Sequence, residues 1–192
     1  MDEAGHPRVV AVVASPRRDG NTRALVEAAL ERLTALGCRC ETIDLCALRI
    51  APCDAHDDCA DRDECVHAAD DADDAIEAVY EAEGLLLASP VYYENVSAQM
   101  KLFMDRCYFP YMHERRLAAG VVGLIAAAAE TGLDDTLAAL RRYVALSSDR
   151  DVPTFTMGAL ADGRGEAAAD PELRAAARHL ADDMARYLLP VV

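Results

Sequence analysis

Basic residues are scarce in this chain: 19 lysine and arginine residues stand against 34 aspartate and glutamate residues, a formal net charge of −15. A surface of that sign repels the phosphates of nucleic acids and of anionic lipid headgroups, so we expect neither nucleic acid nor membrane as a partner. We interpret the acidic excess as a soluble surface and assign it no acidic interaction site.

Long apolar runs are also missing, although 53% of the residues are apolar. No run approaches the length of a membrane-spanning helix. Residues 1–7 lack the basic and apolar regions of a secretory signal, so we expect a cytoplasmic protein. At 192 residues the chain can bury one core, and no linker or repeat divides it. We therefore predict a single domain over residues 1–192.

The glycine signatures of the common nucleotide loops are absent as well. The sequence contains no G-x-x-x-x-G-K-[ST], and its first turn lacks G-x-G-x-x-G, which disfavours ATP chemistry and Rossmann-type dinucleotide binding. In their place the loop S-P-R-R-D-G-N-T, residues 15–22, follows an apolar run. A polar loop between a strand and a helix aims backbone N–H groups at one point. This loop therefore predicts a cradle for a terminal monophosphate.

Apolar runs alternate with helical patterns along the rest of the chain. Strands are expected at 8–14, 40–45, 85–89, 120–127 and 152–157, and helices at 22–36, 71–81, 97–106, 133–146 and from 171 onward. This alternation predicts a three-layer α/β domain with a parallel sheet. The ligand of such a sheet binds beyond the carboxyl ends of the strands, where the loops after residues 14, 90 and 127 lie.

Three segments of the chain stand out as motifs. The first is A-S-P-R-R-D-G-N-T at 14–22. The second is S-P-V-Y-Y-E-N-V-S-A-Q-M-K at 89–101, continued by F-M-D-R at 103–106. The third is a cysteine cluster that starts at Cys53. With these motifs the chain resembles the flavodoxin-like NAD(P)H-dependent FMN reductases, whose first loop has a pattern of the type G-S-P-R-x-x-G-N-T, and especially their iron–sulfur flavoprotein branch. The resemblance covers most of the chain and implies a flavodoxin-like, five-stranded parallel sheet in the order 2-1-3-4-5.

The resemblance also implies a set of FMN contacts. The phosphate would be held by Ser15, Arg17, Asn21 and Thr22. The ring would lie against the second loop, whose residues are Pro90, Val91, Tyr92, Tyr93, Glu94 and Asn95, with both tyrosines beside it. Gly132 is carried over from a third loop, which is alanine-rich where relatives tend to have glycine. Because alanine restricts φ, this loop is expected to approach the flavin differently.

Seven cysteines, an odd number, argue against a disulfide framework in a cytoplasmic chain. Cys53, His56, Cys59 and Cys65 have the spacing C-x2-H-x2-C-x5-C within an acidic insertion at 51–70. In the family branch a compact four-cysteine motif holds a [4Fe–4S] cluster, and His56 occupies the place of its second cysteine. Three interpretations stay open: a cluster on three thiolates and His56, a structural zinc site, or a metal-free loop.

The resemblance implies an FMN-dependent NAD(P)H oxidoreductase that passes electrons from NADH or NADPH to a quinone-like or other small organic acceptor. Hydride transfer needs alignment more than a protein acid or base, so we assign no catalytic residue. One alternative is an iron–sulfur flavoprotein that carries electrons to a protein partner. Another is a non-catalytic flavin-binding module. Relatives imply a homodimer or homotetramer.

Overall fold

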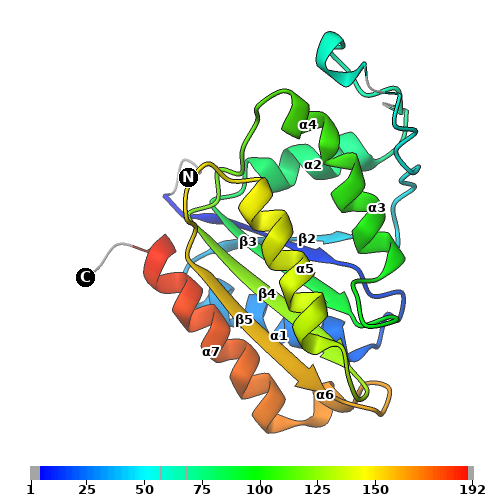
Figure 1. The fold of residues 1–192 in the computed structure, drawn as a ribbon. Helices are drawn as coiled ribbons and strands as arrows, with labels where there is room; N and C mark the ends of the chain where they lie inside the picture. The colour runs from blue at the N-terminus through cyan, green and yellow to red at the C-terminus, as the bar shows by residue number, and fades with distance from the viewer. Residues whose placement is uncertain (1–4, 57, 68, 190–192) are drawn as a thin grey trace.

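A computed structural model describes residues 5–56, 58–67 and 69–189. Its five strands are β1 (Arg8–Val13), β2 (Arg39–Asp44), β3 (Gly84–Pro90), β4 (Val121–Ala128) and β5 (Thr154–Leu160). All neighbouring strands pair in parallel, and their order is β2-β1-β3-β4-β5. The predicted flavodoxin-like sheet is confirmed (Figure 1).

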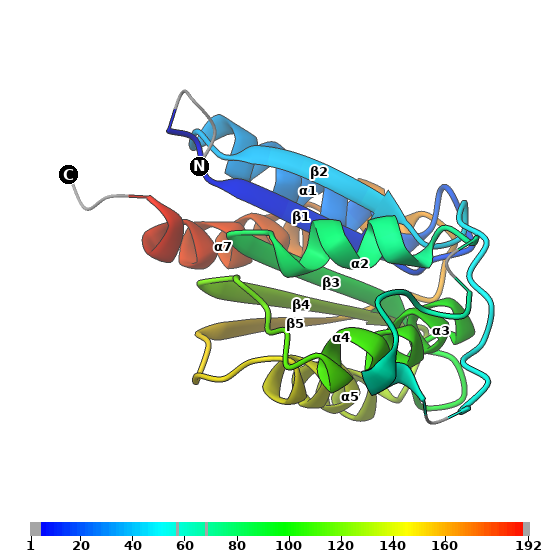
Figure 2. The same ribbon diagram turned by 90° about the horizontal axis from the view of Figure 1, so that it is seen from above.

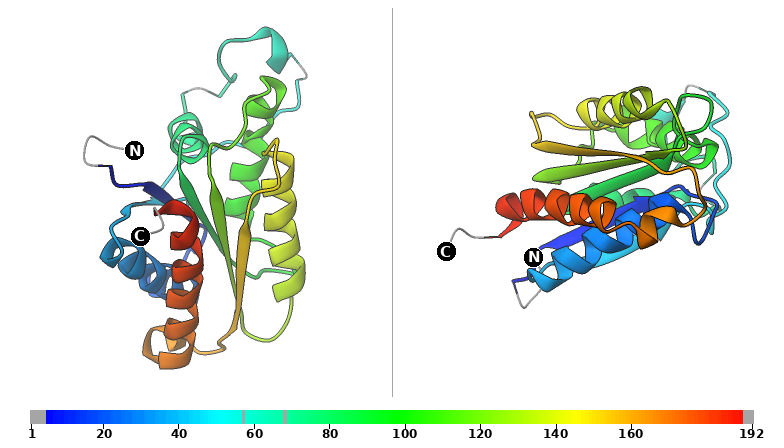
Figure 3. Two further views of the ribbon diagram at one scale, coloured as in Figure 1. Left: turned by 90° about the vertical axis from the view of Figure 1, so that its left-hand side faces the viewer. Right: turned by 90° about the horizontal axis from the view of Figure 1, so that it is seen from below.

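Helices cover both faces of the sheet. The longer ones are α1 (Asn21–Ala35), α2 (Ala72–Tyr80), α3 (Ala98–Arg106), α5 (Leu133–Leu146) and α7 (Pro171–Leu188). Figure 3 shows α1 and α7 side by side on one face, with α3 and α5 on the other. Three short elements were not predicted: the 3₁₀ turn η1 (Cys59–Asp61), α4 (Tyr108–Met112) and α6 (Glu166–Ala169).

The burial of each strand explains its place in the sheet. Arg8, the first residue of β1, and Pro90, the last residue of β3, are half-buried. Every other residue of β1, β3 and β4 is buried, as expected for strands covered on both faces. Side chains alternate between two cores, so that Val10 and Val12 pack with α2, α3 and α5, whereas Val9 and Val13 pack with α1 and α7. The edge strands β2 and β5 are partly exposed.

The C-terminal helix agrees with one detail that the sequence predicts and contradicts another. The pair Asp170-Pro171 predicts the start of a helix, and the structure agrees: the side chain of Asp170 accepts hydrogen bonds from the amides of Glu172 and Leu173 and caps α7. The helical spacing of apolar residues in the same segment predicts that Tyr187 points inward, which is wrong, since 55% of this residue is exposed. The helix buries Met184 on the sheet, and Tyr187 lies at the rim, beside Phe155 of the edge strand.

None of the helices in the described ranges combines the length and apolar character that a bilayer crossing requires.

Gly123 of β4 faces α7 at short range. A Cβ at this position would lie 2.6 Å from Met184 Sδ and 2.8 Å from Leu86 Cδ1. We expect Gly123→Ala to lower the free energy of unfolding by about 1–3 kcal/mol through overpacking. Gly120→Ala is the matched control, because its Cβ would meet one atom, at 3.8 Å. Urea denaturation measures both, and equal stabilities would contradict this packing.

Candidate functional site

A cleft of about 160 Å³ opens at the carboxyl ends of β1, β3, β4 and β5. Its walls are Ser15, Arg17, Gly20, Asn21, Thr22, Pro90, Val91, Tyr92, Ala127, Ala128, Ala129, Ala161 and Asp162. The loops after β1, β3 and β4, which the sequence placed at one end of the sheet, therefore meet around one space. The segment after β5 joins them, and no motif pointed to it.

The loop after β1 presents the N-terminus of α1 to this cleft. Gly20 occupies the N-cap position, and no described side chain caps the helix or adds acidic charge to its first turn. The hydroxyl-bearing residues Ser15 and Thr22 are both buried beside it, and Ser15 Oγ donates to Arg17 O at 3.3 Å. A Cβ at Gly20 would lie 3.0 Å from Ser15 Oγ. The loop thus leaves first-turn amides available to an anion.

Asn21 has a role that its motif did not indicate. Its Nδ2 donates to Ala161 O at 3.0 Å and to Gly163 O at 2.9 Å, and its Oδ1 accepts from the amide of Ala167 at 3.1 Å. Both amide protons are used, so this side chain fastens the segment 161–167 to the start of α1. Direct contact of Asn21 with a phosphate stays a prediction.

A surface ion pair fastens the same two segments a second time. Arg164 Nη2 lies 2.6 Å from Asp19 Oδ1, and the hydrogen bond from Arg164 lowers the pKa of Asp19. Both side chains are well exposed, so this pair contributes little to stability compared with the bonds of Asn21.

The loop after β3 ends in a strained turn. Val91 N donates to Ala127 O at 2.8 Å, and Tyr92 and Asn95 exchange two backbone hydrogen bonds. Between them, Tyr93 and Glu94 have φ angles of +50° and +59°, the conformation of a type I′ turn that normally takes asparagine and glycine. Such positions cost about 1–3 kcal/mol each and cluster at functional sites.

The turn is braced from two sides. Ser97 Oγ donates to Ala14 O at 2.9 Å, and the amide of Ser97 donates to Ser89 Oγ at 2.9 Å, with both serines fully buried. On the other side, Gly132 has a φ of +84°, and a Cβ there would lie 2.9 Å from Glu94 Cα. The two serines thus tie the loop after β1 to the loop after β3. Ser97 had no role in the sequence-based prediction, and its position before α3 marks it only as a helix-capping residue.

The predicted ring contacts divide into two groups. Pro90, Val91 and Tyr92 line the enclosed cleft. Tyr93, Glu94, Asn95 and Gly132 are not among its walls. Tyr93 is fully exposed at the tip of the turn.

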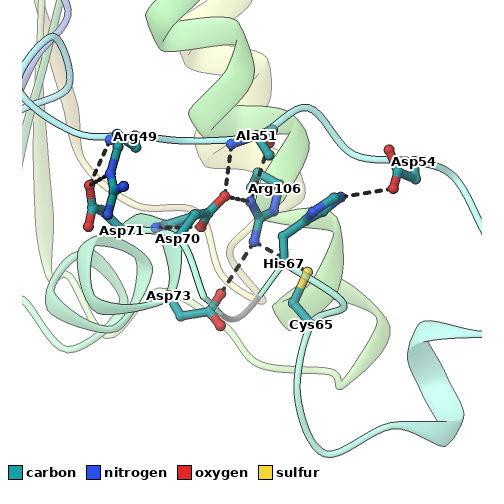
Figure 4. Close-up of polar contacts among 10 residues, drawn as sticks. Arg49, Ala51, Asp54, Cys65, His67, Asp70, Asp71, Asp73 and Arg106 are labelled. Carbon is teal, nitrogen blue, oxygen red and sulfur yellow. Dashed lines mark hydrogen bonds and ion pairs between the residues drawn. The ribbon is translucent and has the colours of Figure 1, made fainter.

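The cysteine insertion folds into a second, much smaller hollow. Cys53, His56, Cys59 and Cys65 line a space of about 10 Å³, with Arg106 and Phe109 among the other walls. Cys59 Sγ lies 4.0 Å from His56 Nε2. Arg106 Nη2 donates to Cys65 Sγ at 3.3 Å, a contact that Figure 4 draws. Burial and the neighbouring Cys53 and Cys65 raise the pKa of the Cys59 thiol.

These four side chains are not assembled around one point. Within residues 5–56, 58–67 and 69–189, no group of three His, Cys, Asp or Glu side chains is placed to hold a metal ion. The donor set of three thiols and an imidazole nevertheless suits a thiophilic metal. Metal binding by Cys53, His56, Cys59 and Cys65 stays a prediction.

Two larger hollows lie away from the cleft. One, of about 300 Å³, is lined by side chains of α3, α4 and α5, including Met104 and Tyr108. The other, of about 510 Å³, includes Arg141, Val152 and Tyr187. Neither combines an uncapped helix N-terminus with strand-end loops, so size alone does not identify the site.

The model of the family described as NADPH-dependent FMN reductase matches residues 7–180. This chain belongs to that family. Family membership agrees with the resemblance that the loops at 14–22 and 89–101 carry.

Two curated relatives are named iron–sulfur flavoproteins. The protein of Archaeoglobus fulgidus is 37% identical over 131 residues, which cover 68% of this chain and 59% of the relative. The protein of Methanocaldococcus jannaschii is 32% identical over 99 residues, which cover 52% of this chain and 51% of the relative. The chain thus spans only part of the length of each relative.

Solved structures share the fold at low identity. An NADH:FMN oxidoreductase in its apo form superposes with a TM-score of 0.70 at 18% identity, covering 96% of this chain and 91% of the other. An NAD(P)H:quinone oxidoreductase from Methanothermobacter marburgensis gives a TM-score of 0.67 at 20% identity, covering 97% and 99%.

The strained turn makes a prediction of its own. Tyr93→Asn should raise the free energy of unfolding of the ligand-free protein by about 0.5–1 kcal/mol, because asparagine tolerates a positive φ better than tyrosine. Since Tyr93 is fully exposed, the exchange removes little packing. Guanidinium denaturation measures the change, and a loss of stability would contradict the assignment of strain.

Proposed function

We propose that this protein binds FMN in the cleft beyond β1, β3 and β4 and passes electrons from NADH or NADPH to a small organic acceptor. One observation carries the proposal: the uncapped N-terminus of α1 and the loop after β3, whose Tyr92 begins the strained turn, border the same cleft. Membership of the NADPH-dependent FMN reductase family supports it.

The residues of the cleft fit the phosphate end of FMN. The enclosed 160 Å³ is smaller than the roughly 300–1,000 Å³ of a typical ligand pocket, so it suits a phosphate and the chain next to it. The hydroxyls of Ser15 and Thr22 and the first-turn amides of α1 would donate hydrogen bonds to the phosphate, and Arg17 would add positive charge. Asn21 would act through the segment 161–167 that it holds.

The ring would extend past Tyr92 toward the turn. The two hydrogen bonds of that turn use the amides of Tyr92 and Asn95, which leaves the amides of Tyr93 and Glu94 to face a ligand. Bound FMN would supply hydride acceptance from a nicotinamide and electron delivery to the acceptor. The protein's part is to hold the ring in register with both partners, so no residue is proposed as an acid or base.

We also propose a homodimer or homotetramer, in line with the resemblance. Tyr108 and Tyr111 stack on α4 with 40% and 46% of their surface exposed, next to the 300 Å³ hollow. Aromatic side chains of this kind are common at subunit interfaces.

The phosphate assignment is tested by removing its hydroxyls. Ser15→Ala and Thr22→Ala should each raise the Kd for FMN roughly tenfold or more, since a hydrogen bond to a charged group contributes about 1.5–3 kcal/mol. Fluorescence titration of the apoprotein measures this. Thr42→Ala, an exposed hydroxyl on β2, is the control, and unchanged FMN affinity in both cleft variants would refute the assignment.

Turnover tests the reductase itself. The purified protein with FMN should oxidise NADPH or NADH steadily when a quinone is added, and Ser15→Ala should lose this activity at FMN concentrations below its raised Kd. Absence of turnover with either nicotinamide and with quinone, nitro and azo acceptors would exclude the reductase and leave the flavin-binding module and the electron carrier.

A second candidate, electron transfer to a protein partner, is favoured by the cysteine hollow and by relatives named iron–sulfur flavoproteins. Cys53, Cys59 and Cys65 would hold the cluster, with His56 as the remaining donor. Visible absorbance and metal analysis of anaerobically purified protein decide the point. Iron with sulfide supports the carrier, whereas zinc or no metal contradicts it and leaves the flavin proposal standing.

A further inference from the structure

Arg106 is the largest fully buried side chain in the described chain, with 2% of its surface exposed. It is the last residue of α3, and Figure 4 shows it at the centre of the polar contacts of the cysteine insertion. Its guanidinium forms an ion pair with Asp70 and donates at 3.3 Å to both Ala51 O and Cys65 Sγ. Asp73 Oδ1 lies 3.7 Å from Nη2.

These contacts close the insertion at its base. Ala51 begins the insertion and Asp70 ends it, and Asp70 also accepts from the amides of Ala51 and Ala72 at 2.8 and 2.9 Å. Burial alone would raise the pKa of Asp70, but these amides and Arg106 hold that pKa below its ordinary value. One planar cation thus ties both ends of the insertion and its last cysteine to α3.

Closing the base of the insertion does not by itself explain why the charged side chain of Arg106 is buried. Replacing a buried ion pair by apolar groups of similar size is often neutral or stabilising, so a charge kept inside calls for a reason. Two observations point to a ligand. Arg106 is itself a wall of the cysteine hollow, and its Nε is buried without a hydrogen-bond partner among the described residues. A buried N–H donor on a residue that lines the same hollow as three thiols suits an occupant with anionic sulfur around it.

The charge balance of the hollow points the same way. Asp54 and Asp58 belong to the same insertion, and Asp73 lies just behind it. Three thiolates would add negative charge to this region. Arg62 is exposed and is already paired with Asp58, which leaves Arg106 as the buried cation in contact with a cysteine sulfur.

We propose that Arg106 is the positioning residue of the cysteine hollow: it holds Cys65 in place as a donor and offsets the charge of a thiolate-bound metal group. Cys53, Cys59 and His56 would close on the metal while Cys65 stays fixed to α3. Two neighbouring ligands of a tetrahedral metal lie roughly 3.5 Å apart, so the 4.0 Å between Cys59 Sγ and His56 Nε2 requires a small movement. The inference does not depend on FMN binding.

The test uses Co²⁺ alone, added under anaerobic conditions to protein freed of metal by a chelator. Wild-type protein should develop thiolate-to-cobalt charge-transfer absorption. Arg106→Met should weaken Co²⁺ binding roughly tenfold or more and reduce the absorption per ion to that of Cys65→Ser, because a charge-assisted contact to the donor is lost. Arg106→Lys keeps the positive charge but lacks the planar guanidinium that can donate to several partners at once, so it should restore Co²⁺ affinity only in part.

The control variant is Arg115→Met. Arg115 pairs with Glu77 of α2 at 2.7 Å but lies at the surface, away from the walls of the cysteine hollow, so the Co²⁺ spectrum of this variant should match the wild type. Circular dichroism and the Tm report folding, and flavin absorbance reports the FMN site separately. A parallel arm with iron and sulfide distinguishes a cluster from a single ion.

A second measurement covers the case in which Arg106→Met folds poorly. In metal-free Arg106→Lys, alkylation of Cys65 should be roughly tenfold faster than in the wild type, while Cys38, which is buried in the core on the other face of the sheet, keeps its rate. Two results overturn the proposal: a wild-type protein without a thiolate band, or Arg106 variants that match it in both Co²⁺ binding and Cys65 alkylation.

Discussion

The carboxyl ends of the five parallel strands meet at one edge of the sheet, and the candidate site depends on this constraint. The loops after β1, β3, β4 and β5 come from distant parts of the chain, yet all of them border one cleft. Their geometry is fixed by hydrogen bonds rather than by regular structure. Ser97 joins the first two loops, and Asn21 joins the first to the last. Leaving the buried hydroxyl of Ser97 unpaired would cost its full desolvation free energy, which keeps the first two loops in register.

Because the loops are held rigidly at their base, the turn after β3 can keep a strained backbone at its tip. Tyr93 and Glu94 adopt left-handed backbone angles that neither residue prefers, and Gly132 fills the narrow space behind them with a backbone that no larger residue could adopt freely. Loops that carry function on a rigid scaffold commonly show this arrangement. The proposed flavin ring would meet the tip, whereas its phosphate would meet the braced part of the cleft.

Helix α3 connects the cleft with the cysteine hollow. Its capping residue, Ser97, supports the loops of the cleft, and its last residue, Arg106, supports the hollow. Nine helical residues rise roughly 13 Å, so one short rigid element serves both sites. Figure 2 shows the insertion running along this side of the molecule, with η1 against α4. A structural change at either site would therefore act on a helix whose residues also support the other site.

The sequence by itself determined the layer architecture, because uninterrupted apolar runs and helical periodicity depend on local spacing alone. It also indicated the two loops, at 14–22 and 89–101, that we propose hold the phosphate and the ring, since each motif is contiguous. Only the tertiary structure decided that the side chain of Asn21 holds the segment 161–167, that Ser97 binds Ala14, and that Arg106 lies buried against Cys65. Each of these contacts joins residues at least 41 positions apart in the chain. A hydrogen bond between such residues leaves no periodic trace, because it is defined by the packing of the whole fold.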